Sequence, residues 1–284
     1  MQQPGALYLC ATPIGNLEDI TLRALRTLRE ADAVWCEDTR HTLGLLNHYG
    51  IKKPLVSCHG HNERERAAEL VSVLREGKTV AYCSDAGMPG VSDPGAALLR
   101  ACVDAGLPAT VLPGASAAVT AAALSGLPME RFTFFGFLPR EKKPRRAALM
   151  SMKAQEGLLL LYESPVRLPD TLRELYAELG EREAAVLREL TKVHEEAARG
   201  TLSELMERFR EPPRGECVIA IAGKAQEEPE AVPDEALKGA ILRLLQEGFS
   251  ARDAAAAASA VLGAPKKLAY QRTLALAGKS DSEI

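Results

Sequence analysis

The chain has 284 residues, of which 46% are hydrophobic, and a formal net charge of −3. This length is enough for two domains with real cores. The slight negative charge excludes a global basic field, so any contact with RNA has to come from local patches. The six cysteines form no C-x-x-C pair and lie in or beside apolar segments, which is typical of reduced, buried thiols rather than of disulfides or zinc ligands.

The sequence contains no apolar run of transmembrane length and does not open with a basic-then-apolar leader. We therefore expect a cytoplasmic protein that does not contact a membrane.

Over the first 125 residues, short apolar segments alternate with segments whose apolar residues recur at helical spacing. This alternation favours an α/β fold with a mostly parallel sheet and helices on both faces. Thr21 is a possible cap for the first helix, along Leu22, Leu25 and Leu28. The expected strands are 6–11, 33–36, 55–58, 79–83 and 109–112.

Each of these strands leads into a polar or glycine-rich loop. The carboxyl ends of parallel strands lie at one edge of a sheet, where α/β proteins usually bind their ligands. We therefore expect the loops to meet in one crevice. They are 12–17, 37–41, 59–63, 84–95 and 113–117.

The loop 84–95 has the most distinctive composition, with three glycines, two prolines, two aspartates and two serines. Glycine lets a ligand approach the main chain, and proline keeps the loop shaped. Asp93 and Pro94 are predicted to be the N-cap and the first residue of a helix over 96–105. Acidic and hydroxyl groups without fixed positive charge favour a cationic or neutral ligand, and S-adenosylmethionine fits this description.

The sequence lacks the phosphate loop G-x-x-x-x-G-K-[ST], a G-x-G-x-x-G after the first strand, and a G-x-S-x-G elbow. His59 and His61 have no clear third ligand, so we predict no metal site.

A second α/β domain is predicted to begin after 125–128, with strands at 132–137, 158–162, 184–187 and 217–222. A helix along 172–179 should end at Gly180, and Thr201 with Glu204 fits a capping box. Residues 226–233 are expected to form a linker, followed by three helices, with Ser250 capping the second and Pro265 starting the third. The predicted domains are 1–126, 127–225 and 234–284.

Between the first two strands of the second domain lies a basic run that, like the helical C-terminal segment, suits contact with the RNA backbone. The alternatives are a solvated loop for the run and a packing appendage for the helices. Its predicted RNA-binding residues are Arg140, Lys142, Lys143, Arg145 and Arg146.

Six stretches of the sequence, taken together, identify a family: 9–19, 36–40, 84–95, 113–116, 136–139 and 162–167. In this order along the chain, they resemble the tetrapyrrole methylase superfamily, and within it the bacterial enzymes that methylate the ribosomal RNA of the small subunit. Met88 and Gly90 depart from the family pattern, which usually has threonine and a bulky aliphatic residue there.

The resemblance implies two α/β domains with the cofactor cleft between them, plus a small C-terminal helical segment. It also implies S-adenosylmethionine-dependent 2'-O-methylation of a cytidine in the decoding region of 16S rRNA, within the 30S subunit, by a homodimer. Two alternatives stay open: methylation of a porphyrin or corrin precursor, and a ribosome assembly factor that holds the cofactor without catalysis.

The cofactor contacts follow from the resemblance by position, whereas the catalytic candidates are chosen for their chemistry. The sulfonium methyl group is already activated, but a ribose hydroxyl benefits from a general base or a positive field. Candidates for that role are Glu37, Asp38, His61 and Lys192, and Arg40 and Arg167 are candidates for binding a phosphate or carboxylate. Of these, the predicted catalytic residues are Glu37, Asp38, Arg40 and Lys192. The predicted cofactor contacts are Pro13, Ile14, Asp85, Gly87, Met88, Ser116, Ala117, Glu163, Ser164 and Leu190.

Overall fold

The computed structural model describes residues 3–225 and 233–280. The chain divides into two compact units, Met1–Lys224 and Ala225–Ile284. The predicted linker 226–233 lies outside the described residues, apart from Pro233. In the described ranges, no helix is both long and apolar enough to span a bilayer.

The amino-terminal half of the first unit contains a five-stranded parallel sheet in the order β3-β2-β4-β1-β5. Successive side chains of each strand point to opposite faces, so Leu7 and Leu9 enter one buried cluster while Cys10 enters another. Helices α3 and α4 cover the first face, and α1 covers the second. The predicted parallel sheet with helices on both faces is confirmed. Its elements are β1 (Leu7–Cys10), α1 (Leu22–Glu30), β2 (Ala33–Cys36), α2 (Thr39–His48), β3 (Leu55–Ser57), α3 (Glu63–Arg75), β4 (Val80–Cys83), α4 (Ala96–Ala105) and β5 (Ala109–Leu112).

A second five-stranded sheet has the order β6-β7-β10-β8-β9 and is mixed, because only β6 and β7 pair in parallel. The four predicted strands are present. The fifth, β9, escaped prediction because it is an edge strand with a single buried residue, Ala198, and therefore has no apolar run. The strands are β6 (Phe132–Phe137), β7 (Leu158–Glu163), β8 (Glu183–Arg188), β9 (Glu196–Thr201) and β10 (Cys217–Ile221).

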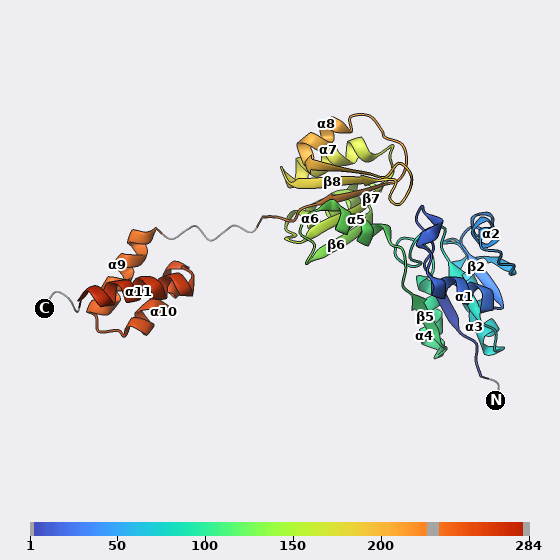
Figure 1. Cartoon of the computed structure of the whole chain (residues 1–284), viewed down its shortest axis with the longest axis horizontal. Coiled ribbons are helices and arrows are strands. Elements are labelled where there is room, and N and C mark those ends of the chain that lie inside the picture. Colours follow the sequence, from blue (N-terminus) through green and yellow to red (C-terminus); the bar gives the residue numbers. More distant parts are fainter. Residues whose placement is uncertain (1–2, 226–232, 281–284) are drawn as a thin grey trace. The chain divides into compact units, whose positions relative to one another are not determined.

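Helices cover both faces of this second sheet (Figure 1). α6 (Lys142–Lys153), α7 (Leu168–Leu179) and α8 (Leu202–Arg208) pack on one face. α5 (Ala117–Ser125) packs on the other through Ala118, Ala121 and Ala122, whose small side chains let its backbone approach the strands. The apolar side of α5 is therefore covered by the second sheet and not by the first, even though α5 directly follows β5 in the chain.

The basic run is only partly a loop. Only 138–141 lie outside a helix, and Lys142 starts α6. Leu149 and Met152 on this helix are buried against the second sheet. Both lie beyond the basic residues, so the run itself gave no sign of the helix.

Most of the predicted helix ends are confirmed. The Thr21 side chain accepts a hydrogen bond from the Ala24 amide, and Gly180 ends α7. The capping box of Thr201 and Glu204 is present.

The prediction that Asp93 caps α4 is wrong, because the helix begins at Ala96 with Gly95 as its N-cap. A carboxylate from another helix takes over this role. Glu63 Oε1 of α3 accepts hydrogen bonds from the amides of Gly95 at 2.6 Å and Ala97 at 2.9 Å. The carboxylate of Asp93 therefore does not cap α4.

Over its described residues, the second unit forms three helices: α9 (Asp234–Gln246), α10 (Ala251–Leu262) and α11 (Lys266–Ser280). They enclose a small core that includes Leu237, Ile241, Ala258 and Ala269. The three predicted helices and the Ser250 cap are confirmed.

Candidate functional site

The loops that follow the strands of the first sheet meet at its carboxyl edge, as predicted. Thr12 and Gly87 exchange two backbone hydrogen bonds of 2.9 and 3.0 Å. The Asp38 amide donates to Asp85 Oδ1 at 3.1 Å, and the Thr12 hydroxyl donates to the Ser84 carbonyl oxygen at 3.3 Å. Loops that are far apart in the sequence therefore form one connected surface.

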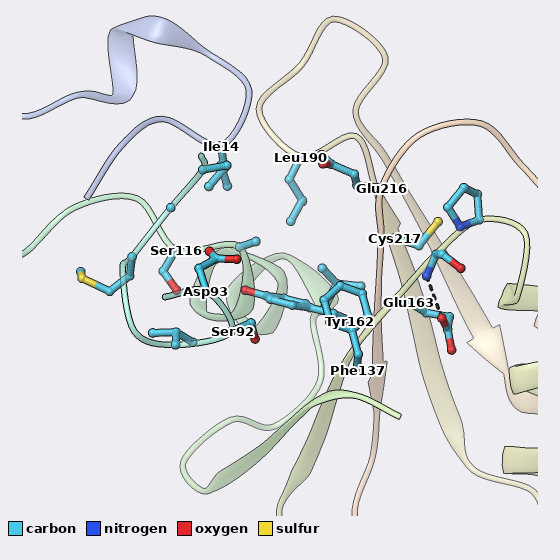
Figure 2. Close-up of a pocket in the computed structure, with 18 residues that line it drawn as sticks. Ile14, Ser92, Asp93, Ser116, Phe137, Tyr162, Glu163, Leu190, Glu216 and Cys217 are labelled. Carbon is cyan, nitrogen blue, oxygen red and sulfur yellow. Dashed lines mark hydrogen bonds between the residues drawn. The ribbon is translucent and has the colours of Figure 1, made fainter. Parts of the chain in front are cut away.

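A cavity of about 320 Å³ lies where these loops face the second sheet (Figure 2). Its volume falls in the range of small-molecule sites, and its lining is predominantly apolar. Leu190 points into the cavity, toward the ring of Tyr162 (Figure 2). The cavity is lined by Ile14, Ala86, Gly87, Met88, Val91, Ser92, Asp93, Ser116, Ala117, Phe137, Tyr162, Glu163, Ser164, Pro165, Leu190, Glu216, Cys217 and Val218.

Asp93 lines the first-sheet side of this cavity, and the carboxylates of Asp85 and Glu37 interact electrostatically with it. Burial raises the pKa of Asp93, and the negative charge of Asp85 raises it further. The pKa of Glu37 is also raised, first by burial and then by Asp85 and Asp93. A cationic ligand would relieve this repulsion, so the electrostatics favour such a ligand over an anion.

Tyr162 forms part of the wall formed by the second sheet. Its hydroxyl oxygen accepts a hydrogen bond of 3.1 Å from the Ala118 amide in the first turn of α5. Burial raises the pKa of this phenol, so it stays protonated at neutral pH. Phe137 and Phe134 contact its ring edge-to-face.

The loop that carries Leu190 has a strained backbone. Glu189 and Thr191, which flank Leu190, have positive φ values of 53° and 64°. Such conformations persist where the surrounding structure holds them. Here the Asn16 amide donates to Thr191 Oγ1 at 3.0 Å, so the loop is held against the loop 12–17 of the first sheet.

Gly15 explains how closely these two loops approach each other. A Cβ atom at this position would lie 2.8 Å from the Leu190 carbonyl oxygen and 2.6 Å from Cγ of Lys192. Any larger residue would therefore push away the loop that closes one side of the cavity.

The structure brings most of the predicted cofactor residues together. Pro13 and Asp85 instead line a separate cavity of about 360 Å³, together with Arg40 and His41. The carboxylate of Glu163 is engaged by Arg167, Thr171 and the Ser164 amide. The predicted residues that line the first cavity are Ile14, Gly87, Met88, Ser116, Ala117, Glu163, Ser164 and Leu190.

None of the four predicted catalytic residues lines the first cavity. Asp38 caps α2 and forms an ion pair of 2.6 Å with Arg40, whose hydrogen bonds lower the pKa of Asp38. Lys192 Nζ contacts Glu189 at 3.0 Å and Glu216 at 2.8 Å, and these contacts raise its pKa. A lysine held in the cationic form is a poor general base.

The prediction missed the aromatic wall. Phe137 and Tyr162 both fall within stretches that carry the family resemblance, but neither was assigned a role. The signal that points to them is their position at the ends of adjacent strands, β6 and β7.

The basic run contains one residue with a structural role. Arg145 has a side-chain exposure of only 13%, and its Nε lies 2.5 Å from a Glu174 carboxylate oxygen. Its Nη2 donates to Thr171 Oγ1 at 2.8 Å, so it joins α6 to α7. The other four predicted RNA-binding residues are exposed: Arg140, Lys142, Lys143 and Arg146.

All six cysteines are free and buried, as expected. Within the ranges 3–225 and 233–280, no group of three or more His, Cys, Asp or Glu side chains is arranged to hold a metal ion.

Two families match the sequence. The Tetrapyrrole (Corrin/Porphyrin) Methylases match residues 6–206, and the RsmI C-terminal HTH domain matches residues 230–277. The first match contains the cavity described above, apart from residues 216–218, and the second covers most of the three-helix unit.

Among similar proteins, the Ribosomal RNA small subunit methyltransferase I of Halalkalibacterium halodurans is 47% identical over 94% of this chain and 93% of its own length. The protein of the same name from Thermotoga maritima is 48% identical over 78% of this chain and 99% of its own length.

Uroporphyrin-III C-methyl transferase from Thermus thermophilus, complexed with S-adenyl homocysteine, shares the fold. It superposes with a TM-score of 0.54 and 22% identity, over 77% of this chain and 92% of its own. The chain thus belongs to the tetrapyrrole methylase family, in the group of ribosomal RNA small subunit methyltransferase I.

Proposed function

We propose that this protein transfers a methyl group from S-adenosylmethionine to the ribosomal RNA of the small subunit. More finely, we propose the 2'-hydroxyl of a cytidine in the decoding region of 16S rRNA as the acceptor. The observation that carries the proposal is 47% identity to a ribosomal RNA small subunit methyltransferase I over 94% of the chain.

The cavity supports the choice of cofactor. Its apolar lining suits adenine, and the carboxylate of Asp93 suits the positive charges of S-adenosylmethionine. When bound, the cofactor supplies an already activated methyl group. The protein's proposed part is to bind it through the eight predicted residues that line this cavity, and to keep water out with Leu190 and Tyr162.

Methyl transfer needs an acceptor oxygen held in line with the methyl group, and positioning alone supplies much of the acceleration. The acceptor hydroxyl must also lose its proton. Of the four predicted catalytic residues, Glu37 suits this step best, because its raised pKa lets it hold a proton. Arg40, with a side-chain exposure of 90%, suits contact with an RNA phosphate.

The competing functions lack comparable support. A porphyrin or corrin precursor does not need the exposed basic residues Arg140, Lys142, Lys143 and Arg146, or a C-terminal segment that matches an HTH domain. We further propose that the substrate is the 30S subunit, which places the enzyme in the cytoplasm. A homodimer is also proposed, supported by the edge strand β5, where Val111 stays 42% exposed.

The decisive experiment supplies tritium-labelled S-adenosylmethionine to purified 30S subunits that lack the modification, to naked 16S rRNA, and to a uroporphyrinogen. We expect label in the 30S subunit, and mapping of the modified nucleotide should find a 2'-O-methylcytidine. Label in the uroporphyrinogen alone would establish the first rival. Binding of cofactor and 30S subunits without transfer would establish the assembly factor.

A further inference from the structure

Strand β6 contains an irregularity that redirects Phe137. Phe134 pairs with Leu160, but Phe137 pairs with Tyr162, so three steps along β6 face two steps along β7. Gly136, at φ 62°, provides the left-handed residue that this bulge needs.

The bulge decides which side of the sheet Phe137 faces. In a regular strand Phe137 would lie on the same face as Phe135, which packs against the core under α6, α7 and α8. The extra residue instead turns Phe137 to the side of Phe134 and Tyr162. Its ring centroid lies 5.5 Å from that of Tyr162, and the residue remains 53% exposed. Bulges next to active sites often aim a side chain in this way.

A second cavity, of about 620 Å³, lies beside this ring. It shares Phe137 and Ser164 with the 320 Å³ cavity, so the two cavities have a common wall. Pro139, Val166, Arg140 and Arg167 complete most of its lining.

The two arginines of the second cavity differ in how free they are. Arg167 is held by a 2.6 Å ion pair with the buried Glu163 and by hydrogen bonds to Ser164 Oγ and the Leu138 carbonyl oxygen. Its charge is therefore largely neutralised, and it acts as a rigid part of the wall. Arg140 is exposed and forms no ion pair within the described part of the chain. Arg140 is thus the cation of this cavity that is available to a ligand.

We propose that the second cavity binds the target nucleotide of the RNA, with its base stacked on Phe137 and a phosphate paired with Arg140. The proposal rests on the proposed function, since it takes RNA as the substrate. Unpaired bases of RNA bind preferentially by stacking on aromatic side chains, and a guanidinium is well suited to phosphate. A ribose connects base and phosphate, so these two contacts place the sugar near the shared wall, where a methyl group from the first cavity would reach it.

The surroundings of the second cavity fit a strand of RNA. Lys142, Lys143 and Arg146 follow Arg140 on exposed positions of the chain, so flanking phosphates would meet further positive charge. Phe137 therefore has two proposed contacts, the cofactor on one side and the base on the other.

The test compares Phe137→Leu, Phe137→Tyr and Arg140→Gln with matched controls at the other end of the same strand. Phe132→Leu changes an equally aromatic residue, 44% exposed, and Arg131→Gln changes an arginine whose side chain is 72% exposed. Neither control residue lines either cavity.

We expect Phe137→Leu to lower kcat/KM for 30S subunits by roughly tenfold to a hundredfold, because stacking on one base is lost. Phe137→Tyr should retain most of the activity, since it keeps an aromatic face. Arg140→Gln should raise KM with less effect on kcat. The Kd for S-adenosylmethionine, measured by calorimetry, should change less than about twofold in Arg140→Gln. In Phe137→Leu it should change by a clearly smaller factor than kcat/KM, because the ring also lines the first cavity.

Binding of a single-stranded cytidine-containing oligoribonucleotide, measured in the presence of S-adenosyl homocysteine, tests the subsite without catalysis. We expect Phe137→Leu and Arg140→Gln to weaken this binding while Phe132→Leu and Arg131→Gln leave it unchanged.

The proposed function and the subsite fail in different ways. If the wild-type protein methylates no RNA, the proposed function is wrong. If it methylates 30S subunits and Phe137→Leu behaves like Phe132→Leu, the subsite is wrong. The subsite is also wrong if Phe137→Leu loses cofactor affinity by the same factor as kcat/KM, because Phe137 would then serve the cofactor alone. Should Phe137→Leu fail to fold, Arg140→Gln on the surface still decides the outcome.

Discussion

Asp93 shows how a correction at one residue changes the view of the site. Its position before Pro94 predicted a helix cap, but Glu63 from α3 provides that cap. Asp93 is instead one of the residues that line the 320 Å³ cavity, with a raised pKa. No pattern within the loop itself could reveal this, because the capping carboxylate of Glu63 lies thirty-two residues before Gly95 in the sequence.

The raised pKa of Asp93 predicts how cofactor affinity depends on pH. In the free protein Asp93 is protonated at acidic pH and ionises only above its ordinary value, whereas a cationic ligand prefers the ionised form. The affinity for S-adenosylmethionine should therefore rise as the pH increases through the acidic range and then level off. Calorimetry between about pH 4 and pH 7 measures this.

The matched variant is Asp93→Asn, which should bind the cofactor more weakly at neutral pH and show a smaller rise. A carboxyl group whose pKa is raised in the folded state destabilises that state as the pH rises through the raised pKa. Asparagine carries no such charge, so the unliganded variant should melt at a higher temperature than wild type at pH 7. An unchanged pH profile in Asp93→Asn would assign the dependence to Glu37, whose pKa is also raised.

Arg145 and Arg146 are adjacent in the sequence, but we expect their alanine variants to differ in the free energy of unfolding. Arg145→Ala removes hydrogen bonds to Glu174 and Thr171 and should lower the free energy of unfolding by roughly 1.5–3 kcal/mol. Arg146 is exposed, so Arg146→Ala should change stability by less than about 0.5 kcal/mol. Urea denaturation of both variants checks this, and equal stabilities would show that the Arg145 contacts contribute nothing.

At the scale of elements, the sequence predicts most of the framework. Strands such as β2 and β5 appear with their observed bounds, because short, mostly apolar runs between turns leave few alternatives. β9 and α6 were missed for the opposite reason. One buries a single residue, and the other begins in a run of basic residues whose apolar face comes later.

The candidate site was predicted less completely, again for a physical reason. The glycine-rich turns and the convergence of the loops follow from a parallel sheet. The walls contributed by Phe137 and Tyr162 depend on the strand order of the second sheet and on a bulge, neither of which local patterns determine.

The strained loop around Leu190 depends on one glycine in another element. In Gly15→Ala the new methyl group would meet the Leu190 carbonyl oxygen at 2.8 Å, so the loop has to move away. We expect at least a tenfold loss of S-adenosylmethionine affinity, about 1.4 kcal/mol, measured by calorimetry.

The matched control for this variant is Gly44→Ala in α2, where an added methyl group meets no atom within 4 Å. It should bind the cofactor like wild type. A Gly15→Ala protein with wild-type affinity would show that the contact between the two loops is unimportant for the cavity.

At the scale of the whole molecule, the net charge of −3 makes RNA binding depend on where the positive charges lie. Lys142, Lys143 and Arg146 are exposed together near the amino end of α6. Replacing all three with glutamine should lower the slope of log K against log salt for 16S rRNA binding by about 2.

The control for that variant replaces three exposed basic residues on the first half of the chain, Arg23, Arg26 and Lys52. Filter binding at several salt concentrations gives both slopes. An equal reduction in the two variants would mean that the protein attracts RNA diffusely, and no reduction in either would remove α6 from the interface.

The packing of α5 on the second sheet also indicates where the chain could be split into two fragments. A break between β5 and α5, rather than after α5, would leave each fragment with its own apolar surface covered, because the buried clusters of the first sheet end at Leu112. Each fragment would then carry only part of the wall of the 320 Å³ cavity, which is the proposed site of S-adenosylmethionine. Reassembly of the two halves should accordingly depend on that small molecule, which would make the pair a metabolite-controlled switch.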